Sequence, residues 1–193
     1  MRRLIFVAIV LVAATASAID TTTHPIRIAL LASSSRWEDR RDAQTSDQVR
    51  NLLRNELRER GYDAFITGDR LADLERDDRA QADFYLDVLG SDGGSYPLGG
   101  IGVGGRNAGI DIAVITSRVA ASVALYDGRS LELLRTIDLQ KRSTAVAPTA
   151  IGLGGRSIWA VIALPIVEWS QYRAGVRFVA RDAARQVDEA LRH

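Results

Sequence analysis

Residues 110–139, IDIAVITSRVAASVALYDGRSLELLRTIDL, contain the clearest structural pattern in this 193-residue chain. Asp127 and Gly128 divide the stretch into two apolar-rich halves. The apolar positions that share a face are Ile115, Val119, Ala121, Val123 and Leu125 in the first half, and Leu131, Leu133, Ile137 and Leu139 in the second. An Asp-Gly pair is a strong hairpin signal, because a type I′ turn needs positive φ, which Gly adopts without strain. We therefore predict an antiparallel hairpin at the centre of a sheet, with helices covering its apolar face.

Two amphipathic helices flank the hairpin in the sequence. The first should begin near Thr45 or Ser46, since either residue can cap a helix, and Gly61 stands where a left-handed residue would end it. Its apolar stripe comprises Val49, Leu52, Leu53 and Leu57. The second helix covers about residues 170–191, and its apolar residues recur at three- and four-residue spacing: Val176, Val179, Ala180, Ala183, Val187, Ala190 and Leu191. Fully burying one Val or Leu contributes about 1.5–3 kcal/mol, so losing this helix should unfold the domain.

Three short strands and a short helix complete the predicted pattern. Residues 26–32 and 62–67 form the first two strands, and residues 70–79 form an acidic helix. Residues 82–89 alternate and form a third strand with one polar face. The predicted fold class is α+β: a two-layer sandwich with a mixed, mostly antiparallel sheet of about five strands and helices on one face.

Two segments of unusual composition separate these elements. Residues 90–109 contain nine of the 16 glycines, and residues 141–157 are rich in Ser, Thr, Ala and Gly. We interpret both as long glycine-rich loops within one domain, not as linkers between domains. The hexapeptides IGVGGR and IGLGGR, at residues 101–106 and 151–156, echo each other, but a single echo does not make a repeat fold.

Residues 158–167 are strongly apolar around Trp159. Ten residues are too few to span a bilayer as a helix. A buried strand is the favoured interpretation, since short apolar runs usually belong to a core. Contact with a membrane or with a partner subunit is the alternative.

The start of the chain has the parts of a secretory signal peptide. Arg2 and Arg3 precede an apolar run, and small residues follow at positions 16–18. An uncleaved anchor is the alternative, but the run is shorter than the roughly 20 residues that a membrane span needs. Cleavage after residue 18 would remove two of the 25 basic residues and none of the 24 acidic ones, which leaves a formal charge of −1. We expect residues 19–193 to form a single periplasmic domain without disulfides, since the chain has no Cys.

Catalytic and metal-binding patterns are missing from the sequence. The two histidines, His24 and His193, stand near the predicted mature amino terminus and at the last residue, and no set of residues has metal-ligand spacing. A G-x-S-x-G nucleophile elbow does not occur. Gly100, Gly102 and Gly105 satisfy G-x-G-x-x-G, but the dinucleotide motif requires a strand before it and a helix after it. We expect no catalytic residue, no cofactor and no metal.

The order of the predicted elements resembles a group of bacterial envelope domains. The features that carry the resemblance are residues 52–64 (helix, Gly61, strand), residues 82–88, and residues 119–134 with their LYDG turn. The group includes the amino-terminal domain of TolB and the periplasmic domain of the curli channel CsgG, which share an anticodon-binding-like α/β fold. The resemblance implies a mixed sheet, no catalytic site and a role in envelope assembly or transport. This chain departs from the lipoprotein members because it has no Cys after its signal.

These observations favour a non-enzymatic periplasmic interaction module, associated with an outer-membrane assembly or transport complex. The expected partners are envelope proteins or a second copy of the chain, and the charge balance argues against nucleic acid. Membrane contact is left open, but no span is expected after signal cleavage. The candidate partner-binding residues are Tyr96, Gly102, Arg106, Arg156, Trp159 and Trp169. Aromatic residues dominate binding hot spots, although core packing is an equal alternative for both tryptophans.

Two other functions stay open from the sequence. A small-ligand or lipid-binding auxiliary of a transporter would have a continuous apolar cavity of about 300 Å³ or more, lined by residues 158–167 and the hairpin. A carboxylate-based hydrolase would need two carboxyl groups facing each other across a cleft. The acidic residues between positions 69 and 87 are better interpreted as a solvated face balanced by neighbouring arginines.

Overall fold

The computed structural model describes residues 24–32, 40–74, 82–105, 108–153, 156–157 and 160–192. The predicted signal peptide lies outside this part of the chain. The elements in chain order are β1 (Arg27–Leu30), α1 (Arg40–Glu59), β2 (Asp63–Ile66), α2 (Leu71–Leu74), β3 (Phe84–Gly105), β4 (Ala108–Asp127), β5 (Leu133–Leu153), β6 (Arg156–Ser157) and α3 (Ala160–Arg192).

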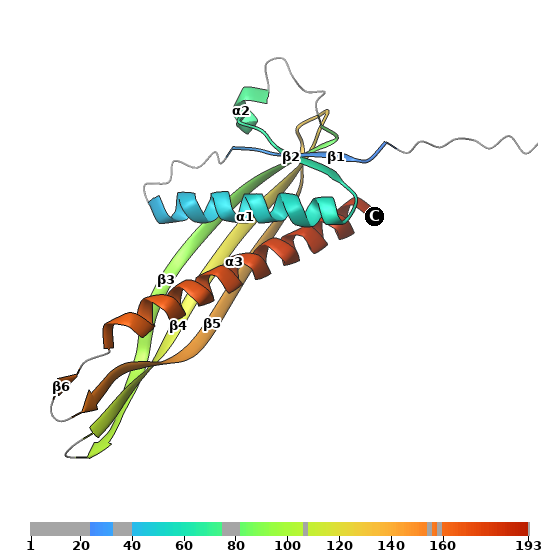
Figure 1. The fold of residues 1–193 in the computed structure, drawn as a ribbon. Helices are drawn as coiled ribbons and strands as arrows, with labels where there is room; N and C mark the ends of the chain where they lie inside the picture. Colours follow the sequence, from blue (N-terminus) through green and yellow to red (C-terminus); the bar gives the residue numbers. More distant parts are fainter. Residues whose placement is uncertain are drawn as a thin grey trace, which may run out of the picture.

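The sheet is mixed and mostly antiparallel, as predicted. Its strand order is β2-β1-β3-β4-β5-β6. β1 pairs in parallel with β2 and β3, and the other pairs are antiparallel. The two long helices, α1 and α3, pack on one face of this sheet (Figure 1). The predicted α+β sandwich is therefore confirmed.

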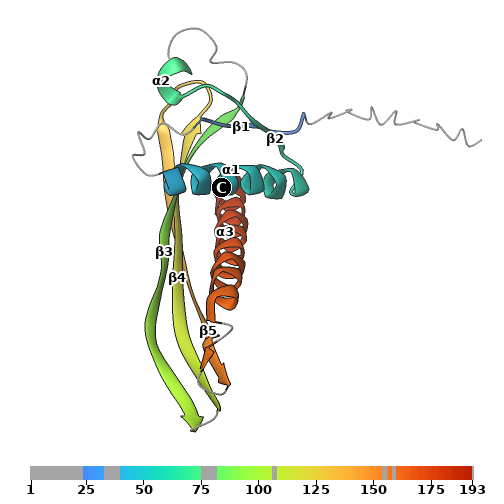
Figure 2. The same cartoon turned by 60° about the vertical axis from the view of Figure 1, so that its left-hand side comes forward.

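Three long strands give the molecule its shape. β3, β4 and β5 are 22, 20 and 21 residues long and extend as a ribbon well past the short strands β1 and β2 (Figure 1). α3 runs along this ribbon, and α1 crosses it near β1 (Figure 2).

The ribbon corrects the predicted glycine-rich loops at residues 90–109 and 141–157. Residues 90–105 belong to β3, residues 108 and 109 to β4, and residues 141–153 to β5. The hydrogen bonds of a ladder come from the backbone, so glycines extend a strand where partner strands hold them in register. The composition alone suggested loops because glycine lowers intrinsic strand propensity.

The hairpin between β4 and β5 is confirmed, but its two-residue Asp-Gly loop is wrong. β4 ends at Asp127 and β5 begins at Leu133. Asp127 Oδ1 accepts hydrogen bonds from the backbone nitrogens of Arg129 and Ser130, at 2.9 and 2.7 Å. Gly128 is required by close packing, because a Cβ there would lie 2.1 Å from the carbonyl oxygen of Ala82. The aspartate therefore caps a longer loop, and the glycine provides space instead of positive φ.

The main core lies between the sheet and the two long helices. The stripes predicted for both helices are buried there, with Val49, Leu53, Leu57, Val179 and Val187 fully inaccessible to solvent. A smaller cluster of Ala29, Leu31, Leu74, Ala82 and Tyr85 lies on the opposite face, where α2 contributes Leu74. Side chains of a strand alternate between faces, so β1 supplies both clusters.

Both long helices begin earlier than predicted. α1 starts at Arg40, so Thr45 and Ser46 lie inside it and are buried; their hydroxyls donate to the carbonyl oxygens of Arg41 and Asp42. α3 starts at Ala160, so the strand predicted at residues 158–167 is wrong from residue 160 onward. A short apolar run fits a helix as well as a strand, and periodicity does not separate the two. The helix predicted at residues 170–191 is confirmed within α3. None of the helices described has a stretch long and apolar enough to cross a membrane.

Candidate functional site

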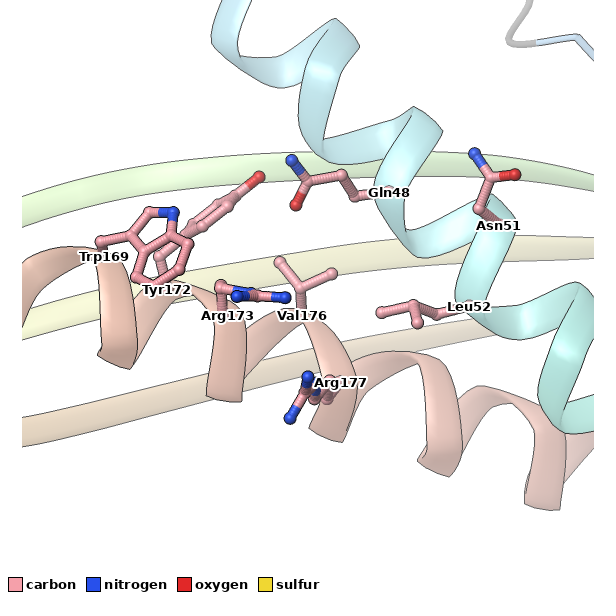
Figure 3. A pocket seen from close by; sticks show the side chains of 8 residues that line it. All are labelled: Gln48, Asn51, Leu52, Trp169, Tyr172, Arg173, Val176 and Arg177. Carbon is pink, nitrogen blue, oxygen red and sulfur yellow. The ribbon is translucent and has the colours of Figure 1, made fainter.

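A groove of about 460 Å³ lies between α1 and α3 (Figure 3). α1 contributes Gln48, Asn51 and Leu52 to its wall. The residues from α3 are Trp169, Tyr172, Arg173, Val176 and Arg177. Side chains three and four positions apart lie on one side of a helix, so each helix presents a continuous wall.

The groove follows directly from the two amphipathic patterns. Val49 and Leu53 point from α1 into the core, and Val176 does so from α3. The residues beside these stripes are polar on both helices, since Gln48 and Asn51 flank one and Arg173 and Arg177 flank the other. Where the two stripes meet, the seam between the helices therefore has an apolar floor and polar walls.

Tyr172 connects α3 to α1 through a hydrogen bond at the groove. Its hydroxyl oxygen is 2.8 Å from Thr45 Oγ1, and Thr45 Oγ1 donates to the carbonyl oxygen of Arg41. The Thr45 proton is thus in use, so Tyr172 is the donor of the pair. Burial raises the pKa of Tyr172 above its ordinary value, and the charge of Asp92 adds to this shift. Tyr172 is therefore a neutral structural donor at physiological pH.

Trp169 is the exposed aromatic residue at the end of the groove. Its side chain is 59% exposed, and the guanidinium carbon of Arg173 stands 4.5 Å from the centre of its ring. A cation over a tryptophan face is attracted by the ring quadrupole, by about 0.5–1 kcal/mol at exposed sites. This contact holds Arg173 along the helix surface.

The arginines of the groove differ from those farther along α3. Arg181 pairs with Glu56 at 3.5 Å, Arg185 with Asp182 at 2.6 Å, and Arg192 with Asp188 at 2.9 Å. Arg173 and Arg177 have no carboxylate within 4 Å among the described residues. The groove therefore combines two unneutralised guanidinium groups with two carboxamides and an exposed tryptophan.

Trp169 is the predicted partner-binding residue that lines this groove among the residues that the structure describes. Trp169 lies there, exposed and outside the core. Tyr96 is 42% exposed in β3 and pairs with Thr116, whose neighbour Ile115 packs against Val167 of α3. Because strand residues alternate, Tyr96 belongs to the face without α3.

Of the other four predicted residues, two lie in strands that the structure describes. Gly102 lies in β3, and Arg156 lies in β6. Arg106 and Trp159 lie outside the described residues. Their proposed roles in partner binding stay predictions.

Sequence reasoning missed the polar walls of the groove. An available signal was the spacing of Trp169, Arg173 and Arg177, which follow one another at four-residue intervals along a predicted helix. The contribution of Gln48 and Asn51 had no such signal, because only the packing angle of α1 on α3 brings them opposite these residues.

A second hollow of about 420 Å³ lies on the sheet face away from the long helices. Its residues are Leu89, Ser91, Ala120, Ala121, Ser122, Asp138, Leu139 and Gln140. Small side chains in the middle strand leave the hollow between larger neighbours. Neither it nor the groove has two carboxylates in its lining, and no cluster of three or more metal-ligating residues exists in the part of the chain that the structure describes.

No protein-family model matches the sequence, and no curated protein matches it. Several solved structures are similar to the fold at low identity. A homolog of the neuraminyllactose-binding hemagglutinin, from Helicobacter pylori, has a TM-score of 0.49 and 10% identity, covering 86% of this chain and 84% of that one. A minor lipoprotein from Acinetobacter baumannii has a TM-score of 0.37 and 16% identity, covering 86% and 91%. The PelC dodecamer from Paraburkholderia phytofirmans has a TM-score of 0.33 and 14% identity, covering 81% and 86%.

These similarities are too distant to transfer a ligand or an assembly. Bacterial lipoproteins recur among the structures, and each reported TM-score is below 0.5. The finer resemblance to the TolB and CsgG domains stays a prediction.

Proposed function

We propose that this chain is a non-enzymatic interaction module of the bacterial envelope, and that it binds its partner in the groove between α1 and α3. The observation that carries the proposal is the pair Arg173 and Arg177, which lack a carboxylate partner in the described structure and stand beside the exposed Trp169. Export by the signal-like residues 1–18 would bring the chain to the periplasm.

Interface energetics support this assignment of the groove. Tryptophan, tyrosine and arginine are the residue types most enriched at binding hot spots. A guanidinium group donates through a planar fork that fits carboxylates. The groove has both residue types on a rigid helix, which lowers the entropy cost of ordering them on binding.

The experiment is site-specific photocrosslinking in living cells, with the full chain expressed in its own host. A benzophenone amino acid replaces Asn51 in the groove, and in the control it replaces Arg142, which is exposed on β5. We expect the Asn51 position alone to capture an envelope protein, whose crosslinked segment is identified by mass spectrometry. The double variant Arg173→Gln/Arg177→Gln should abolish the product. Equal capture from both positions, or an unchanged product in the double variant, would contradict the proposal.

Fractionation tests the location separately. We expect the mature chain in the periplasmic or outer-membrane fraction, and a cytoplasmic chain would exclude an envelope role.

The hollow on the other sheet face favours a second candidate function, binding of a small apolar ligand. Its volume lies within the range of about 300–1,000 Å³ that ligand sites occupy. Replacing Ala120 by Leu would fill it. This candidate predicts that the Ala120→Leu variant loses a bound lipid or metabolite that native mass spectrometry detects on the wild-type chain.

A further inference from the structure

We infer that the groove takes an acidic peptide segment of the partner, with two carboxylates one helical turn apart on Arg173 and Arg177 and an apolar side chain against Trp169. This inference rests on the proposed function and names the chemistry of the partner.

Charge complementarity is the first argument. Arg181, Arg185 and Arg192 on the same helix are neutralised by carboxylates of this chain. Arg173 and Arg177 are the ones that border the groove, and none of the described residues that line it is acidic. A partner that approaches this surface therefore meets two cations whose natural counter-ions are carboxylates.

The spacing of the exposed residues is the second argument. Ile166, Trp169, Arg173 and Arg177 follow one another at three- and four-residue intervals, so they form one stripe about 16 Å long on α3. Ile166 is 61% exposed and Trp169 is 59% exposed. The stripe thus has an apolar end and a cationic end. Residues four apart on a helix have Cβ atoms about 6 Å apart, which matches two acidic residues at the same spacing in the ligand.

The openness of the groove favours a peptide over a small free anion. Small-molecule sites enclose about 70–90% or more of their ligand, whereas Trp169 is more than half exposed and Arg173 and Arg177 are also exposed. Gln48 and Asn51 on the opposite wall are carboxamides, and although Asn51 Nδ2 donates to the carbonyl oxygen of Asp47 at 2.8 Å, Asn51 keeps its oxygen and its second N–H for a ligand. Such groups fit the backbone or polar side chains of a segment that continues past both ends of the groove.

Synthetic peptides test the inference with the purified full chain. The probe has one leucine and two glutamates, each four residues apart, in a helical background of alanine and glutamine, and it carries a fluorophore. The control peptide has glutamine in place of both glutamates. Fluorescence polarisation should give at least about tenfold weaker binding for the glutamine peptide. Binding of the glutamate peptide should also weaken as salt rises from about 0.05 to about 0.5 M.

Matched variants separate the groove from general charge. Arg173→Gln/Arg177→Gln should weaken the glutamate peptide at least about tenfold. The control Arg129→Gln/Arg142→Gln removes the same charge from two exposed residues outside the groove and should change binding less than about twofold. Equal losses in both double variants would overturn the inference, because attraction would then be non-specific.

Other occupants give distinct results. Competition by free glutarate as strong as by the peptide would assign the groove to a small anion. Binding to phosphatidylglycerol vesicles through the same two arginines, without peptide binding, would assign it to a lipid surface. Either result overturns the acidic-peptide inference. If crosslinking at Asn51 captures an envelope protein while the glutamate and glutamine peptides bind alike, the proposed function stands and this inference fails.

Discussion

The side-chain hydroxyl of Ser46 on α1 forms hydrogen bonds with the backbone of Gly90 in β3, at a point of this strand beyond its pairing with β1. Ser46 Oγ accepts from the Gly90 nitrogen at 2.8 Å and lies 3.2 Å from the Gly90 carbonyl oxygen. Two residues farther along, the Asp92 nitrogen donates to Asp42 Oδ1 at 2.8 Å. The paired register of β1 with β3 ends at Leu86. Side chains of α1 therefore satisfy the β3 edge at Gly90 and Asp92, which makes this part of the edge less available for pairing with another chain.

Gly90→Ala should destabilise the fold through overpacking. An added Cβ would lie 2.8 Å from the Ser46 nitrogen and 2.9 Å from the Thr45 carbonyl carbon, and both are backbone atoms that cannot rotate away. We expect a loss of about 1–3 kcal/mol in the free energy of unfolding, measured by urea denaturation. Gly68→Ala is the control, because a Cβ at Gly68 meets nothing within 4 Å. Similar losses in both variants would show that α1 is not held this close to β3.

Gly128→Ala should be more damaging than Gly90→Ala. A Cβ at Gly128 would lie 2.1 Å from the Ala82 carbonyl oxygen and 2.5 Å from that of Asp83. The Gly128 nitrogen also donates to the Asp83 oxygen at 2.8 Å, so the loop must lose this bond to make room. We expect a destabilisation above the 1–3 kcal/mol that is typical of overpacking, seen as a lower yield of folded protein and a lower thermal midpoint. A wild-type midpoint would contradict the contact.

Gly175 and Val119 should be energetically coupled. A Cβ at Gly175 of α3 would lie 2.8 Å from Val119 Cγ2 of β4. Gly175→Ala alone should destabilise the fold, since the clash outweighs the gain of up to about 1 kcal/mol in helix propensity. In a Val119→Ala background the same change should be much less destabilising, because Cγ2 is removed and the nearest remaining atom is the Cβ of residue 119, at 3.2 Å. A double-mutant cycle by chemical denaturation measures the coupling; a coupling energy near zero would contradict the close approach.

Tyr62 and Asp188 should make stability depend on pH. The Tyr62 hydroxyl donates to Asp188 Oδ1 at 2.6 Å. This hydrogen bond, helped by Arg192, holds the pKa of Asp188 below its ordinary value. The resulting stability is present above the ordinary aspartate pKa of about 3.9 and is lost as pH falls through the lowered value. Tyr62→Phe should therefore cost about 1 kcal/mol at pH near 7 and less in acid.

At alkaline pH the dependence is reversed, and stability falls as pH rises. Burial, and then the hydrogen bond to Asp188, raises the pKa of Tyr62. Its contribution is present below the ordinary tyrosine pKa of about 10 and is lost as pH rises through the raised value. Urea denaturation of wild type and Tyr62→Phe across this pH range checks both limits. A difference between the two proteins that does not change with pH would contradict the assignment.

Trp169→Ala should leave the fold intact. The side chain is 59% exposed, and exposed substitutions usually change the free energy of unfolding by about 0.5 kcal/mol or less. Leu53→Ala, at a fully buried position of α1, should cost about 2–5 kcal/mol. Thermal unfolding of both variants compares them. A large loss for Trp169→Ala would return this residue to the core and remove it from the binding surface.

Much of the fold was predictable where each residue's role depends on its near neighbours in sequence. The three- and four-residue spacing of Val49, Leu53 and Leu57 predicted the buried face of α1. Gly61 has φ of +91°, as the predicted helix end requires. The alternation around residues 119–125 predicted the central strand. In each case the hydrophobic effect acts on one face of one element, so the local pattern is sufficient.

The long ribbon could not be predicted from composition. The glycines among residues 90–105 predicted a loop, because glycine is depleted in strands. Their extended conformation comes from pairing with β4, whose residues are distant in sequence. The groove was missed for the same reason, since Gln48 and Trp169 become neighbours only after α1 and α3 have packed.

Local sequence patterns were sufficient to predict the α+β class, the two amphipathic helices and the hairpin between β4 and β5, because periodic burial needs no knowledge of the partner element. The length of the ribbon, the spatial requirement for Gly90, Gly128 and Gly175, and the assembly of the groove became apparent from the folded structure. These features depend on which backbone and side-chain atoms approach each other across the fold, and such distances are set only when distant segments pack together.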